Sequence, residues 1–319
     1  MTQGDDGDRP PALRTVGLGR RYGHVWGLRD CTLTVPAGAV AGLVGPNGAG
    51  KTTLLQMIIG LLQPTEGQLE VFGDTSRANS TEALARVGYV AQDHPLYRDF
   101  SVADMFHLGR AMNPGWDQGA ATARMDALDI PLKRKVKTLS GGQQAQVSLA
   151  MALAKRAPLL ALDEPVSSLD PIARLDFMRE VMAAAADTGV TVLIASHVVS
   201  ELERRCDWLI VLTGGRVQLA GPVDELLAEH RVFTVPRATR DTELPGLLIH
   251  RADSDRHSTA LVRTDPARLA AQERPGWEVE PVGFEQLVLA YLQRPAGAST
   301  DDHAQAAARP APATKEVTR

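Results

Sequence analysis

The chain has 319 residues, 44% of them hydrophobic and 23% charged, which is ordinary for a globular protein. Its length exceeds that of one ordinary domain, so we expect one large and one small domain. The net charge of −4 gives no indication of a nucleic-acid partner. No apolar run approaches the length of a membrane span, and the polar, acidic start lacks the features of a signal peptide. We therefore expect a soluble chain that needs another polypeptide for any role at a membrane.

The first predicted elements are three short strands. Residues 1–12 are expected to form a disordered tail, and strands are predicted over Leu13–Leu18, Cys31–Val35 and Val40–Val44. Tyr22 lies between the first two strands. An aromatic ring ahead of a phosphate loop could stack on a base, although the local sequence alone favours a half-buried tyrosine at a strand end.

The next segment fits the phosphate-binding pattern G-x-x-x-x-G-K-[ST] at every fixed position. It follows a predicted strand and precedes a predicted helix over Leu54–Leu62, which is the context that separates this motif from a chance glycine-rich turn. Its glycines let backbone N–H groups point into one concavity, and the helix adds its positive N-terminal end. Lys51 is expected to reach the β- and γ-phosphates, and the Thr52 hydroxyl to bind Mg²⁺. The segment consists of Gly45, Pro46, Asn47, Gly48, Ala49, Gly50, Lys51, Thr52 and Thr53.

Two weaker candidates follow. A predicted strand over Val87–Ala91 ends at Gln92, whose amide oxygen could reach a metal or water, although an ordinary solvent-facing residue is the better interpretation of spacing alone. Beyond two predicted helices, Leu139–Gln143 opens a helix that runs to about Lys155. Ser140 is a good N-cap, and the adjacent Gly141 and Gly142 suit a backbone that presses against a phosphate.

An apolar strand over Leu159–Leu162 ends in two carboxylates. At the carboxyl end of a parallel strand, Asp163 is placed to hold Mg²⁺ through water and Glu164 to act as a general base. The alternative is an N-cap pair for the next helix, which Ser168-Leu169-Asp170-Pro171 starts. The next predicted strand, over Val190–Ala195, leads to His197, which could contact a γ-phosphate or the attacking water or could be structural.

The last part of the chain changes character at about residue 230. Short β-like runs and a helix over Phe284–Leu292 predict a small α+β domain over residues 230–294. We expect it to pack on its own small core and to be dispensable for the chemistry. Residues 295–319 are rich in alanine, proline and polar residues, and we expect them to be disordered.

Taken together, residues 13–229 resemble the ATPase subunit of an ABC transporter. The phosphate loop, the signature Leu139–Gln143 and the carboxylate strand Leu159–Glu164 occur in the order typical of that family. The resemblance implies an α/β fold, with a P-loop NTPase core of mainly parallel sheet, an antiparallel β subdomain and a helical subdomain over about residues 93–157. It also implies ATP as substrate, Mg²⁺ as cofactor, and catalysis by Glu164, His197 and Lys51.

The resemblance assigns the remaining residues as well. Tyr22 stacks on adenine, and Gln92 holds Mg²⁺ together with Thr52 and Asp163. A second subunit, in a homodimer or heterodimer, contacts the same ATP through its signature and its D-loop. The residues that act in this way are Ser140, Gly141, Gly142, Gln143 and Asp170.

The resemblance also implies where the chain works. The helical subdomain and the segment after Gln92 are expected to contact an integral membrane permease, which places the chain in the cytoplasm at the inner face of the membrane. The segment Asn113–Asp117 and the C-terminal domain look like the branch that serves ABC-2-type bacterial export systems.

Two departures from the family pattern leave the catalytic groups in place. Gln144 and Gln146 stand where basic residues usually follow the signature, and Val166 stands where threonine is commoner.

The runner-up function is that of a soluble ABC ATPase acting on nucleic acid or ribosomes. Such proteins tend to carry two of these domains or a long coiled coil, whereas this chain has one domain, no heptad run and an acidic net charge. A third possibility is a regulatory module that binds nucleotide without turnover, against which the intact Glu164 and His197 argue.

Overall fold

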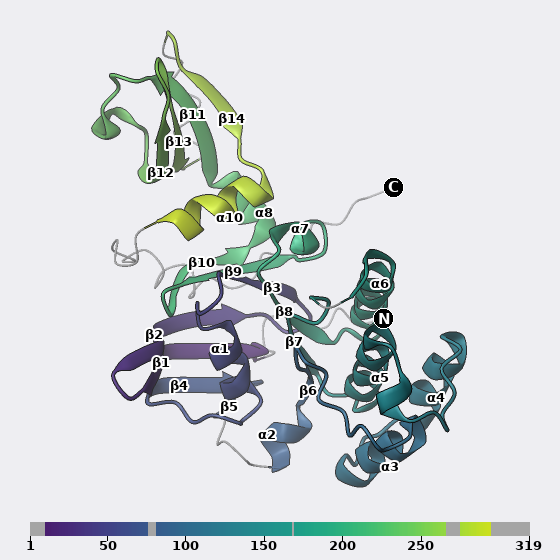
Figure 1. The fold of residues 1–319 in the computed structure, drawn as a ribbon. Coiled ribbons are helices and arrows are strands. Elements are labelled where there is room, and N and C mark those ends of the chain that lie inside the picture. Colours follow the sequence, from purple (N-terminus) through teal and green to yellow (C-terminus); the bar gives the residue numbers. More distant parts are fainter. Residues whose placement is uncertain (1–9, 76–80, 168, 266–274, 295–319) are drawn as a thin grey trace, which may run out of the picture.

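The computed structural model describes residues 10–75, 81–167, 169–265 and 275–294 (Figure 1). The predicted tail 295–319, most of the predicted tail 1–12, and Ser168 lie outside the described residues. None of the helices in the described ranges is long and apolar enough to cross a membrane.

A six-stranded sheet forms the centre of the molecule, with the strand order β10-β9-β3-β8-β7-β6. Its strands pair in parallel except for the β9–β10 hairpin. The parallel arrangement brings the carboxyl ends of β3, β8, β7 and β6 to one edge, where ligands bind in sheets of this kind. The strands are β3 (Val40–Val44), β6 (Val87–Val90), β7 (Leu159–Asp163), β8 (Thr191–Ser196), β9 (Trp208–Thr213) and β10 (Arg216–Pro222).

Both faces of the central sheet are buried, as the uninterrupted apolar sequences of β7 and β8 predict. Alternate residues of each strand point to opposite faces, so Leu160 and Leu162 join one core cluster while Leu159 and Ala161 join the other. Helices α5 (Gly141–Ala154) and α6 (Pro171–Thr188) cover the first face. Helix α1 (Lys51–Ile58) covers the second.

A second sheet is antiparallel, in the order β2-β1-β4-β5, and shares the core cluster of α1. Its strands are β1 (Leu13–Tyr22), β2 (Val25–Val35), β4 (Glu66–Val71) and β5 (Asp74–Thr75). Strands β1 and β2 are longer than predicted because they continue into a hairpin, in which Tyr22 pairs with Val25. The polar residues of that hairpin show no apolar alternation that could have predicted a strand.

Three helices form a layer beside the central sheet with a core of their own (Figure 1). They are α3 (Val102–Met112), α4 (Gln118–Ala127) and α5, with the short helices α2 (Thr81–Ala85) and η1 (Val136–Thr138) before and between them. Helix α3 begins with a capping box made by Ser101 and Asp104. This helical layer carries the signature segment at the start of α5.

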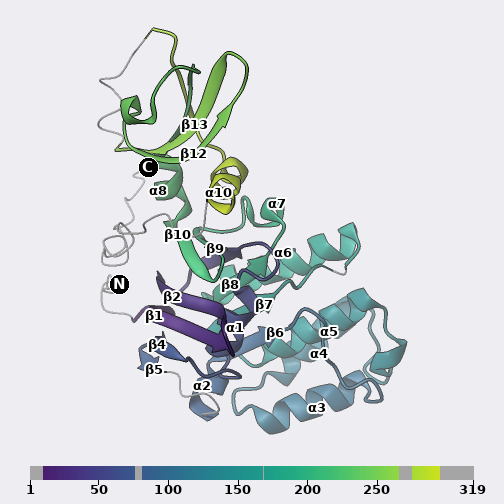
Figure 2. The same cartoon turned by 60° about the vertical axis from the view of Figure 1, so that its left-hand side comes forward.

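The C-terminal part holds a third sheet, antiparallel, in the order β12-β13-β11-β14 (Figure 2). Its elements are β11 (His230–Pro236), η2 (Asp241–Glu243), β12 (Leu247–Asp253), β13 (His257–Arg263), β14 (Glu278–Pro281) and α10 (Phe284–Gln293). One face of this sheet packs on a small cluster around Phe233 and Val235.

The other face of this third sheet is not separate from the rest of the molecule. Val232 and Leu261 point to α10, and α10 belongs to the same core cluster as the central sheet. The helices α7 (Val199–Leu202) and α8 (Val223–Ala228) lie at this junction. The expected small core is present on one face of the sheet, whereas on the other face α10 joins the sheet to the central core, because the apolar residues of β11 alternate onto two faces.

Candidate functional site

The phosphate loop joins the end of β3 to the start of α1. Gly48 and Gly50 have φ values of 81° and 105°, in the left-handed region that favours glycine. A Cβ on Gly50 would lie 2.4 Å from the carbonyl oxygen of Gly27, so this position excludes any side chain. Among the described residues no side chain caps the first turn of α1, which leaves its N–H groups available for an anion.

Lys51 lies at the centre of this loop and is almost fully buried. Its Nζ donates to the Gly45 carbonyl at 2.7 Å and lies 3.4 Å from the Pro46 carbonyl. The same Nζ is 3.3 Å from Oε1 of Glu164, in a buried ion pair. The loop and the end of β7 are therefore joined through one ammonium group.

Glu164 is held in an unusual backbone conformation. Its φ of 47° is in the left-handed region, which costs a non-glycine residue about 1–3 kcal/mol and is often found at functional sites. Its N–H donates to the Ala195 carbonyl at 3.0 Å, which ties it to β8. Oε2 of Glu164 is 2.7 Å from Nδ1 of His197, directly after β8. The structure thus brings together Lys51, Glu164 and His197 from three separate segments.

Asp163 and Thr52 form the part of the site that could hold a metal. Oδ1 of Asp163 is buried and has no hydrogen-bond partner among the described residues. Burial raises the pKa of Asp163 above its usual range, and the hydrogen bond with Thr52 offsets only part of this. An unpaired buried carboxylate oxygen next to a hydroxyl fits a divalent cation such as Mg²⁺, which prefers oxygen ligands.

Gln92, the third predicted metal ligand, is not hydrogen-bonded to Thr52 or Asp163 in the described part of the chain. It follows β6, beside the strand that carries Asp163, but its side chain is exposed. A residue that the sequence did not single out is closer: the Tyr89 hydroxyl on β6 is 3.5 Å from Oδ2 of Asp163.

Tyr22 lies beside the phosphate loop, at the end of β1, with 45% of its surface exposed. A Cβ on Gly27 would lie 2.8 Å from the Tyr22 ring and 3.2 Å from the Thr53 hydroxyl, so Gly27 is the residue that brings the ring close to the loop. Sequence reasoning missed Gly27. Its signal is a glycine inside a strand, which often marks a close approach of another group.

The signature residues lie at the start of α5. Ser140 caps the helix, and its hydroxyl accepts from the Gln143 N–H at 3.2 Å. Asp170 caps α6 in the same way, with Oδ1 accepting from two N–H groups at 3.0 Å. Across the described ranges, no hydrogen bond or ion pair joins Ser140–Gln143 or Asp170 to the phosphate loop. The structure therefore does not show these residues at the phosphate loop of their own chain.

Comparison with known proteins decides the family. Residues 28–167 match the family described as ABC transporter. The Nod factor export ATP-binding protein I of Ralstonia nicotianae is 33% identical over 299 residues, which cover 90% of this chain and 91% of that protein. The chain belongs to the ATP-binding subunits of ABC transporters. As an ABC subunit it is an ATPase that powers a membrane transporter, and the predicted family, fold class and function are confirmed.

Two further comparisons agree with this family. The bacitracin transport ATP-binding protein BcrA of Bacillus licheniformis is 29% identical over 223 residues, covering 69% of the ABC subunit and 73% of that protein. The solved structure of CbiO1 from Clostridium perfringens, part of the ABC transporter complex CbiONQ, has a TM-score of 0.60 and 28% identity. That alignment covers 69% of this chain and 92% of CbiO1.

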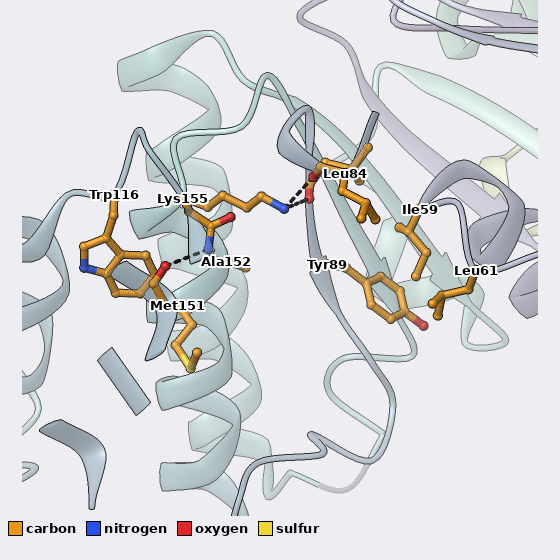
Figure 3. A pocket seen from close by; sticks show the side chains of 11 residues that line it. Ile59, Leu61, Leu84, Tyr89, Trp116, Met151, Ala152 and Lys155 are labelled. Atoms are coloured by element: carbon orange, nitrogen blue, oxygen red, sulfur yellow. Dashed lines mark hydrogen bonds between the residues drawn. The ribbon is translucent and has the colours of Figure 1, made fainter. Parts of the chain in front are cut away.

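The ABC subunit also has an apolar groove between α1, β6 and the helical layer, with a volume of about 280 Å³ (Figure 3). Lys155, just after α5, closes one wall by donating to the carbonyls of Leu84 and Val87 at 2.6 and 2.9 Å. Tyr89, which contacts Asp163, is part of the lining. The other lining residues are Ile59, Leu61, Gly109, Asn113, Trp116, Met151 and Ala152. Tyr89 thus links the groove to the carboxylate of Asp163.

Proposed function

We propose that two subunits, either two copies of this chain or this chain and a related one, bind ATP at two shared sites. Each site combines the phosphate loop of one subunit with the signature of the other. Closure on ATP and opening after hydrolysis then move a membrane-embedded permease.

The observation that carries this proposal is the open space at Gly141. Gly141 does not have a positive φ, and a Cβ placed on it would meet no atom within 4 Å. Nothing within the described chain therefore requires glycine at this position. A group from outside that approaches the backbone closely would require it, and a phosphate at the N-terminus of α5 is such a group.

The chemistry proposed for each site is hydrolysis of the γ-phosphate. The phosphate loop binds the nucleotide and Lys51 balances charge on the β- and γ-phosphates. Glu164 accepts a proton from the attacking water, and His197, hydrogen-bonded to Glu164, steadies that water. The bond between the β–γ bridging oxygen and the γ-phosphorus breaks, and ADP and inorganic phosphate leave.

Mg²⁺ is the cofactor that we propose for this site. Thr52 and Asp163 would hold it, with Gln92 as a third ligand once its exposed side chain turns toward them. When bound, the ion would neutralise phosphate charge.

The permease is proposed to dock in the apolar groove. The groove lies between the central sheet and the helical layer that carries the signature, so a partner seated there contacts both parts that form the shared site. Leu61, one of the lining residues, is 63% exposed and adds apolar surface to the groove. We place the chain at the inner face of the cell membrane. The segment that begins after Gln92 joins β6 to α3, which both contribute residues to the groove, and we include this segment in the contact.

The direction of transport is proposed to be export, through an ABC-2-type system. The Nod factor export ATP-binding protein I is named for export. Its alignment with this chain covers 91% of that protein and 90% of this chain. The alternative of action on nucleic acid or ribosomes has no support among the relatives described above.

A mixed dimer tests the shared site. Lys51→Ala damages the phosphate loop, and Ser140→Arg places a bulky side chain at the signature. Each homodimer then has two defective sites. A mixed dimer has one site with both lesions and one complete site, built from the loop of the Ser140→Arg chain and the signature of the Lys51→Ala chain.

We expect mixing to restore ATP-dependent dimerisation, measured by gel filtration with Mg-ATP on the Glu164→Gln background so that complexes persist. The Glu164→Gln chain alone is the positive control. If the mixture dimerises no better than the separate variants while labelled subunits demonstrably exchange, the shared-site proposal fails.

A further inference from the structure

One buried arginine joins three helices outside the phosphate site. Arg124, on α4, donates to Oε1 of Gln146 on α5 at 2.6 Å and to Oε2 of Glu180 on α6 at 2.5 Å. Only 10% of its side chain is exposed. A buried guanidinium needs hydrogen-bond partners, so these contacts add a polar restraint on where α4 and α5 lie relative to α6.

The contact lies close to the signature. Gln146 is one helical turn beyond Gly142, and a Cβ on Gly142 would lie 3.5 Å from Cβ of Ala173 in the first turn of α6. Helices α5 and α6 therefore touch near their first turns and are joined again through Arg124. The two helices also share buried apolar residues on the central sheet, and the polar link adds a directional contact to this packing near the start of α5.

The start of helix α4 is hydrogen-bonded to the end of α5. The Asp117 carboxylate at its start accepts from the Arg156 guanidinium, just after α5, at 3.0 Å, and the Asp117 N–H donates to the Ala154 carbonyl at 2.7 Å. Helices α4 and α5 are therefore held together at the far end as well as through Gln146. Among the side-chain hydrogen bonds described here, the one between Arg124 and Glu180 joins this pair of helices to α6.

We propose that Arg124 is a positioning residue for the signature: its link to Glu180 aims the start of α5 at the nucleotide of the partner subunit. The proposal rests on the shared site described above. It also accounts for the departure at Gln146, where the family usually has a basic residue. Here the positive charge comes from α4, and a glutamine at 146 is the acceptor that this arginine needs.

The proposal predicts a defect that acts on the partner's site. On the Glu164→Gln background, Arg124→Leu should leave ATP binding to the monomer unchanged, because the phosphate loop is untouched. The ATP concentration for half-maximal dimerisation should rise at least tenfold, equivalent to about 1.4 kcal/mol. Arg110→Leu, which removes an exposed arginine from α3, is the matched control and should change neither value.

Mixed dimers then locate the defect. Arg124→Leu paired with Lys51→Ala yields one site with an intact loop and an intact signature, so dimerisation should recover. Arg124→Leu paired with Ser140→Arg yields no such site, so dimerisation should stay weak. General destabilisation of the fold would not distinguish these two mixtures. Equal recovery in both mixtures, or unchanged dimerisation of the Arg124→Leu homodimer, would overturn the proposal.

Two further variants keep the test independent of folding. Glu180→Gln removes the ionic partner while preserving shape, and it should reproduce the pattern of Arg124→Leu. Arg124→Gln combined with Gln146→Arg moves the guanidinium from α4 to α5. In the parent chain the Arg124 guanidinium contacts both Gln146 and Glu180, so an arginine at position 146 lies within reach of Glu180. This double variant should dimerise better than Arg124→Leu. If the parent Glu164→Gln chain itself does not dimerise with Mg-ATP, the proposed function fails, which is a different outcome from a normal Arg124→Leu variant.

Discussion

Nδ1 of His197 lies 2.7 Å from Oε2 of Glu164, while Oε1 of the same carboxylate lies 3.3 Å from Nζ of Lys51. The carboxylate is therefore held between a group that follows β8 and a group that starts α1. Its backbone is fixed in the left-handed region at φ 47°. These contacts limit the rotation of the side chain, and a base whose direction is fixed in advance is effective because no reorganisation is needed at the moment of reaction.

The first prediction concerns Glu164→Gln. The amide keeps the shape of the side chain but cannot accept a proton from water, so turnover should fall by about 10²-fold or more. ATP binding should persist, and the ATP-bound dimer should become long-lived. Phosphate release measures the first effect and gel filtration with ATP the second. Glu203→Gln, an exposed carboxylate, is the control. A variant that remains monomeric with ATP would contradict either the role of Glu164 or the dimer.

Lys51→Ala should weaken ATP binding more than any other single change in the loop. The substitution removes a buried positive charge from the phosphates and also leaves Glu164 without its ion partner. Hydrogen bonds to charged groups contribute about 1.5–3 kcal/mol each, so the affinity should fall by at least about tenfold. Titration calorimetry with Mg-ATP measures it, with the exposed Lys133→Ala as control. Near-normal affinity in Lys51→Ala would be incompatible with the site described here.

Tyr22→Ala tests whether the ring binds the base. Stacking on an aromatic ring contributes about 1–3 kcal/mol per base, so ATP affinity should fall about tenfold, whereas Tyr22→Phe should stay near normal. Inorganic tripolyphosphate has no base and separates two explanations. Its affinity should not change in Tyr22→Ala. An equal loss for ATP and tripolyphosphate would mean that the ring supports Gly27 and the loop instead of the base.

Sequence reasoning predicted those parts of the candidate site whose sequence patterns lie within a short stretch of the chain. The strand, loop and helix around Lys51 are consecutive, and the glycines with positive φ at 48 and 50 are part of the motif itself. The apolar strand before Asp163 likewise predicts its own burial and the edge at which it ends. Such features depend on residues within about ten positions of one another, so a pattern can report them.

The parts that the sequence did not predict depend on contacts between distant residues. Tyr89 is 74 positions from Asp163, and Arg124 is 56 positions from Glu180, and no local pattern pairs them. The need for glycine at position 27 is explained only by the fold, which places the Tyr22 ring against it. The same holds for the C-terminal helix: the spacing of Phe284, Leu287, Val288 and Tyr291 predicts an apolar face, but not that this face covers β9 and β10.

A buried histidine at the C-terminal junction gives the last prediction. His230 is fully buried at the start of β11. Its Nδ1–H donates to the Leu226 carbonyl at 2.6 Å, and its Nε2 accepts from the Tyr291 hydroxyl at 2.9 Å. Burial lowers the pKa of His230 to about 4. The folded chain therefore holds the neutral ring, whereas the unfolded chain takes up a proton near pH 6.5.

The sign of the pH effect follows from this difference. The contribution of His230 to the free energy of unfolding is fully present above about pH 6.5 and is lost progressively as the pH falls to about 4. The loss amounts to about 2 kcal/mol by pH 5. His230→Gln should be less stable than the parent at pH 7.5, because the hydrogen bonds are altered. It should then lose fewer degrees of Tm than the parent between pH 7.5 and pH 5, measured in the presence of the same salt. The exposed His257→Gln is the control and should follow the parent. If the Tm of His230→Gln falls by as many degrees as that of the parent over that interval, protonation of another group causes the loss of stability in acid, and the prediction for His230 is wrong.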